Sequence, residues 1–111
     1  MHKKLFICCF FVISILKAQN KKFESLPPSH TGLDFVNTVQ DSKSQNILLY
    51  ANFYGGGGVG LADFDNDGLT DIYFTGNLVG DEIYKNKGDL KFEKKTISAG
   101  ITNDGNWSSG V

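Results

Sequence analysis

The chain has 111 residues, of which 41% are hydrophobic, and its 11 basic and 12 acidic residues give a formal net charge of −1. A chain of this length forms one small domain at most. It lacks the basic stripe that marks nucleic-acid-binding proteins, so nucleic acid is not an expected partner.

The N-terminus has the pattern of a secretory signal peptide. A short basic start is followed by an apolar run, Leu5 to Leu16, and then by Lys17-Ala18-Gln19. The run is shorter than the roughly 20 residues that span a bilayer. The alternative, an amphipathic core strand, disagrees with its uniform apolarity. We predict a signal peptide over residues 1–18 and a secreted, periplasmic or cell-surface protein, with no membrane span in the mature chain.

Cleavage after Ala18 would change the chemistry of the chain. Cys8 and Cys9 would leave with the leader, so the mature chain would contain no disulfide and no thiol chemistry. Three lysines would also leave, and the remaining eight against twelve acids give a formal charge of −4.

The rest of the chain reads as a lead-in over residues 19–52, followed by short strands. Pro27-Pro28 and residues 29–32 punctuate the lead-in, and residues 33–39 are expected to be extended. Strands are predicted at 59–62, 71–75, 82–85 and 91–96, separated by glycine-containing turns. Four short antiparallel strands are typical of one β-propeller blade, so we predict an all-β fold.

The most explicit chemistry lies in the loop between the first two predicted strands. Four carboxylates occupy positions 1, 3, 5 and 9 of a nine-residue segment, and Gly68 occupies position 6: the acids are Asp63, Asp65, Asp67 and Asp71. Alternate side chains of a coiled loop can converge on one point, and the glycine allows the carbonyl of Leu69 to point inward. An all-oxygen shell of this kind suits Ca²⁺. The alternative is a solvated Asp/Asn/Gly turn.

The residues around the loop indicate which kind of calcium loop it is. A helix-loop-helix site needs a glutamate at position 12, where this chain has Phe74. The flanking segments contain β-branched and aromatic residues, which favour strands. We therefore expect a loop that joins two antiparallel strands.

A weak repeat supports a blade-like unit. Gly58-Val59 returns as Gly110-Val111 after a complete four-strand unit, and residues 106–111 read as the start of a second unit. Residues 58–72 and their continuation through residues 83–89 and Phe92 resemble an FG-GAP/VCBS repeat, the unit of integrin-α-type β-propellers, as found in secreted bacterial proteins, some of which also carry an ASPIC/UnbV-type module.

The resemblance places one repeat at residues 53–105. It implies Ca²⁺ as the cofactor, with Asp63, Asp65, Asp67 and Asp71 as side-chain ligands and Leu69 as a carbonyl ligand. It also implies that Asn66 faces outward. Members of the family join several such blades into a ring, whereas this chain has one complete repeat. We therefore expect an N-terminal fragment of a larger protein, and a lone blade with two uncovered faces that folds poorly by itself.

Two functional interpretations follow. The first is a non-catalytic, calcium-stabilised propeller segment for structural support, adhesion or binding of an extracellular protein or glycan. The second is the scaffold part of a larger secreted enzyme whose catalytic domain is missing from this chain. The mature chain contains one histidine, no cysteine and no Gly-x-Ser-x-Gly motif, so no nucleophilic triad is predicted.

Two other patterns were weighed. Gly55, Gly57 and Gly60 match a dinucleotide-binding fingerprint, but that motif must open a helix, and here it leads into a strand. The aromatic residues at positions 50, 53, 54 and 107 are expected to pack in a core, with stacking on sugars as the alternative.

Overall fold

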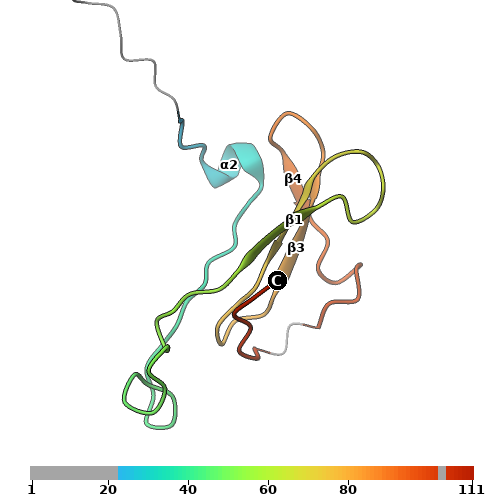
Figure 1. Ribbon diagram of the computed structural model, residues 1–111. Helices are drawn as coiled ribbons and strands as arrows, with labels where there is room; N and C mark the ends of the chain where they lie inside the picture. The colour runs from blue at the N-terminus through green and yellow to red at the C-terminus, as the bar shows by residue number, and fades with distance from the viewer. Residues whose placement is uncertain (1–22, 103–104) are drawn as a thin grey trace, which may run out of the picture.

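The structure, a computed structural model, describes residues 23–102 and 105–111. One antiparallel sheet contains four strands in chain order (Figure 1): β1 (Val59–Ala62), β2 (Asp71–Phe74), β3 (Glu82–Asn86) and β4 (Phe92–Lys94). The predicted all-β fold is confirmed at this level. That the sheet is a propeller blade stays a prediction, and the predicted signal peptide lies outside the described residues.

The register of the strands divides the side chains between two faces of the sheet. Ile72 is opposite Tyr84, and Tyr84 is opposite Lys94, so these three side chains share one face. We call it the strap face. Tyr73 is opposite Ile83, and these two residues lie on the other face, which we call the loop face.

The turns explain where β4 begins and why it is shorter than predicted. The β3–β4 connection has positive φ at three successive residues, Gly88, Asp89 and Leu90. Two backbone hydrogen bonds close it, from Lys87 to Lys91 and from Lys91 to Gly88. Regular pairing therefore starts at Phe92 rather than at Lys91. Beyond Lys94, a single backbone bond from Lys95 to Ile83 continues the ladder.

The lead-in contains one helical turn that the sequence analysis missed. α2 spans Pro28–Thr31 and ends at Gly32, which has φ +76°. Pro28 is at the start of the helix, where a missing N–H costs nothing, and Gly32 provides the left-handed C-terminal conformation. Pro28 and Gly32, which the sequence indicated as loop residues, thus lie at the two ends of a short helix.

Residues 32–39, which we call the strap, cross the strap face of the sheet. The ring of Phe35 stacks on that of Phe74 at 4.9 Å with 9° between the ring planes. Asn37 exchanges two hydrogen bonds of 2.8 Å with Asn77, which is fully buried in the β2–β3 turn. Burial alternates along the strap, as expected for an extended segment.

The strap corrects the expectation that a lone unit leaves both of its faces uncovered. The lead-in itself covers the middle of one face, where Tyr84 is completely buried. The cover does not extend to β1, because Val59 and Leu61 on the same face remain 60% and 66% exposed. Burial of apolar side chains is therefore concentrated where the strap crosses β2 and β3.

The C-terminal residues also pack back on the sheet. Trp107 forms an antiparallel bridge with Asn77, and the Ser108 N–H donates to the carbonyl of Gly76 at 2.9 Å. The side chain of Val111 lies against Gly60 on the loop face. Within the described residues, no helix is long and apolar enough to cross a membrane.

Gly32 offers a test of the packing between strap and sheet. A Cβ atom there would overlap the carbonyl oxygen of Phe92, whereas one at Gly100, with nearly the same φ of +75°, would meet nothing within 4 Å. We expect Gly100→Ala to lower the free energy of unfolding by about 1 kcal/mol, from backbone strain alone, and Gly32→Ala by about 3 kcal/mol. Urea unfolding measures both, and equal losses would contradict the close approach.

The strap is also expected to respond to acid. The Tyr84 hydroxyl donates to Asp34 Oδ1 at 2.6 Å, and the Lys94 ammonium lies 2.9 Å from the same atom. These contacts, Tyr84 first, lower the pKa of Asp34 below its ordinary value of 3.8. Because the pKa of Asp34 is lower in the folded state, its ionised carboxylate stabilises the fold at pH values above 3.8. This contribution to stability is lost as the pH falls through the lowered pKa.

The measurement is the NMR shift of Tyr84 during an acid titration. We expect Tyr84 to report loss of the Asp34 contact below pH 3.8 in the unmodified chain. Asp34→Asn should remove that step and weaken strap docking at neutral pH. An unchanged acid step in the variant would assign it to another carboxylate.

Candidate metal site

The acidic loop is held in a coil by its own backbone. Gly68 has φ +87°, which confirms the predicted positive-φ turn, and Asn66 also adopts positive φ at 60° and is exposed as expected. Asp63 accepts two backbone hydrogen bonds, from the N–H of Asp67 at 3.1 Å and of Gly68 at 2.9 Å. The first acid of the loop therefore anchors the turn that follows it.

Asp71 joins this loop to the sheet. Asp71 is 2% exposed, whereas all residues from position 61 to position 70 are exposed. One carboxylate oxygen accepts from the N–H of Phe64 at 3.1 Å, and the other accepts from the N–H of Asn86 on β3 at 2.8 Å. The Asn86 amide in turn donates to the carbonyl of Thr70 at 2.8 Å.

Three of the four predicted side-chain ligands come together. Asp63, Asp65 and Asp71 each offer one carboxylate oxygen within 4.8 Å of the other two. Two oxygens bound to one Ca²⁺ at 2.3–2.6 Å lie at most about 5 Å apart. The donor set is thus of the right chemistry and spacing for a single Ca²⁺, although exposed acidic groups also cluster without a metal.

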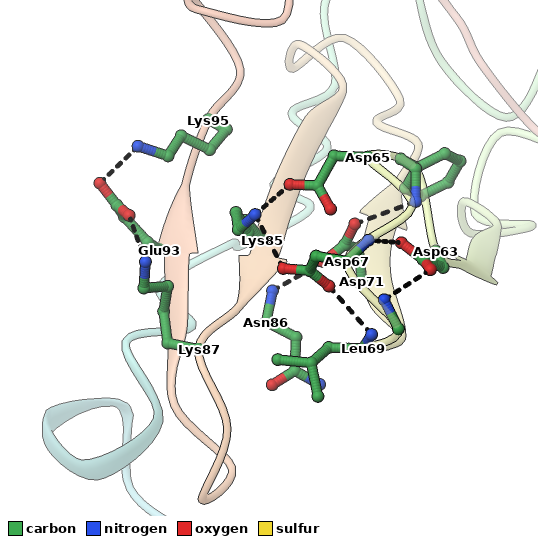
Figure 2. Close-up of polar contacts among 12 residues, drawn as sticks. Asp63, Asp65, Asp67, Leu69, Asp71, Lys85, Asn86, Lys87, Glu93 and Lys95 are labelled. Atoms are coloured by element: carbon green, nitrogen blue, oxygen red, sulfur yellow. Dashed lines mark hydrogen bonds and ion pairs between the residues drawn. The ribbon is translucent and has the colours of Figure 1, made fainter.

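Asp67 is placed differently from the other three acids. One of its oxygens accepts from the N–H of Leu69 at 2.9 Å, and the other lies 2.8 Å from the ammonium of Lys85. Lys85 also forms an ion pair with Asp65, as Figure 2 shows. The Lys85 contact, followed by the Leu69 N–H, lowers the pKa of Asp67, and the pairing with Asp65 and Asp67 raises the pKa of Lys85. The Leu69 carbonyl stays a predicted ligand.

Sequence reasoning missed Lys85 and Asn86, which belong to this site through the sheet. Both were read only as part of, or next to, the third strand. The signal that could have found them is the pairing of β2 with β3, which brings residues 84–86 beside the end of the loop. A charged residue two positions after Ile83, on the same face, is then directed toward the acids.

The four aromatic residues for which sugar stacking is the alternative lie next to one another but differ in exposure. Phe53 is 1% exposed and packs on Trp107 at 5.5 Å, as predicted for a core residue. Tyr50 meets the edge of Trp107 at 5.1 Å, and these three rings line an open hollow of about 440 Å³. Tyr54 is 60% exposed and donates to Asp41 at 2.5 Å.

Comparisons with protein-family models, with curated proteins and with solved structures found no match for this chain. The class of protein that the structure itself defines is a small all-β unit with one antiparallel sheet and an acidic loop between its first two strands. The resemblance to an FG-GAP/VCBS repeat therefore stays a prediction from the sequence.

Substitutions of Asp71 and Asp65 distinguish the structural role of the loop acids from their role in metal binding. In Asp71→Asn, an amide group would face the N–H of Phe64 or Asn86 and leave a buried donor without an acceptor. We expect a loss of about 1–3 kcal/mol in the free energy of unfolding in the presence of a chelator. Asp65→Asn changes an exposed carboxylate and should cost less than about 1 kcal/mol. Urea unfolding in EDTA checks both, and equal effects would contradict the assigned role of Asp71.

Proposed function

We propose that this chain is a secreted, calcium-binding repeat unit of β-propeller type, in which Ca²⁺ braces the β1–β2 connection. The observation that carries the proposal is the convergence of Asp63, Asp65 and Asp71 to within 4.8 Å. These are three of the acids that the loop spacing predicts as ligands, and the positive φ of Gly68 supports the required coil.

The role of the metal in this proposal is structural. The hydrogen bonds of Asp71 already join the loop to β3, so an ion held by Asp71 would be fixed to the sheet. An ion shared with Asp63 and Asp65 would then tie the exposed loop to that point. It would also neutralise carboxylates that otherwise repel one another, and so stabilise the folded state by mass action.

The proposed unit serves as a non-catalytic support for binding or adhesion outside the cell. The basic start and apolar run of residues 1–18 support secretion, and they would place the loop in a compartment where weak calcium sites are filled. An extracellular protein or glycan is the proposed partner. The hollow lined by Tyr50, Phe53 and Trp107 is the concave apolar surface that supports such a role.

Calcium titration of the full 111-residue chain tests the proposal. We expect a single site with a dissociation constant on the order of 10⁻⁴ to 10⁻³ M by calorimetry, and a lower thermal midpoint after chelation. Asp65→Ala and Asp63→Asn should weaken binding at least tenfold, because the first removes a ligand and the second removes the negative charge of one. Asp89→Asn, an exposed change in the β3–β4 turn, is the matched control. No saturable binding, or unchanged affinity in Asp65→Ala, would overturn the assignment.

A further inference from the structure

Asp65 belongs to two groups of charges at once. Its carboxylate is one of the three that lie within 4.8 Å of one another, and it is also paired with the ammonium of Lys85. The same ammonium lies 2.8 Å from Asp67, the predicted ligand that stands apart from the other three. Lys85 is 25% exposed in this position, so its charge is partly shielded from water.

Lys85 has a further acidic neighbour, Glu93, on the side away from the loop. Glu93 on β4 is its direct partner in the strand register, and the two side chains share the loop face. Figure 2 shows Lys85 between the loop acids and β4, with Glu93 held by Lys95 at 2.6 Å and approached by Lys87 at 3.8 Å. The Glu93 side chain is 49% exposed, so it can accept another ammonium without leaving solvent.

We propose that Lys85 is an internal cation that competes with Ca²⁺ for Asp65 and moves toward Glu93 when the metal binds. The inference rests on the proposed calcium site and adds the residue that sets its affinity. A divalent ion and an ammonium on one carboxylate repel each other, so each weakens the binding of the other there. The structure thus shows the loop with its acids partly neutralised by the protein itself.

The exchange accounts for the position of Asp67. While Lys85 occupies the loop, one Asp67 oxygen is committed to the ammonium and the other to the Leu69 N–H. Departure of Lys85 frees the first oxygen, and Asp67 then becomes available as the fourth carboxylate that the loop spacing predicts. Calcium affinity is therefore reduced by the free energy of the Lys85 ion pairs.

A double-mutant cycle on the full chain tests this exchange, with Ca²⁺ alone as the ligand. Lys85→Met keeps the apolar stem and removes the charge, and we expect it to tighten calcium binding about three- to tenfold by calorimetry. In EDTA the same variant should have a lower thermal midpoint, because the loop loses its internal cation. Lys91→Met is the matched control: Lys91 is an exposed lysine of the β3–β4 turn and belongs to none of the ion pairs among the described residues, so the affinity should change less than about twofold.

Glu93→Gln supplies the second arm of the cycle. It removes the site to which Lys85 moves, so it should weaken calcium binding about two- to threefold in the unmodified chain and have no effect in Lys85→Met. Equal effects of Glu93→Gln in both backgrounds would overturn the exchange, as would equal tightening by Lys85→Met and Lys91→Met. If neither the unmodified chain nor Lys85→Met bound calcium, the proposed calcium site would fall, whereas binding with unchanged affinity in Lys85→Met would overturn the inference about Lys85 alone.

Discussion

The buried carboxylate of Asp71 is the constraint on which the acidic loop depends. Its two oxygens accept backbone hydrogen bonds from Phe64, at the start of the loop, and from Asn86, at the end of β3. A carboxylate that is 2% exposed needs such partners, because an unpaired buried charge is costly. With both oxygens engaged, the loop is fixed to the sheet at one point and its remaining acids are exposed around that point.

The loop is therefore divided into a rigid end and an adaptable end. Asp63 and Asp71 are held by backbone N–H groups and Asp65 by the long side chain of Lys85, whereas Asp67 is held by both the Lys85 ammonium and the Leu69 N–H. A lysine ammonium is a mobile point charge, and it yields its place to another cation more readily than a backbone donor does. Such a division suits a site in which folding precedes metal binding and the metal completes the brace.

The strap provides most of the cover on the opposite face of the sheet. Its contacts combine a stacked aromatic pair, a reciprocal amide pair and a charged cluster around the Tyr84 hydroxyl. Within the described residues, Phe53 and Tyr84 are the hydrophobic side chains that are fully buried, so the apolar core is small. Directed polar contacts therefore contribute much of what specifies the position of the strap.

The local features of the fold follow from the order of the residues alone. Alternation of apolar and polar residues located the four strands to within one or two residues, and the loop spacing located the acids and the glycine of the turn. Local rules succeed there because period-2 burial and positive φ depend on neighbouring residues. The same local rules did not predict the helical turn at Pro27-Pro28, because proline is common both in loops and at the first position of a helix.

The contacts between residues far apart in the chain depend on the complete fold. Lys85 reaches Asp65 because β2 pairs with β3, and Asn37 reaches Asn77 because the strap turns back over the sheet. Neither contact leaves a periodic signal in the chain, since each depends on register and on the path of an extended segment. The spacing of the acids thus predicted what the loop can bind, and the fold determined which cation of the protein already occupies part of it.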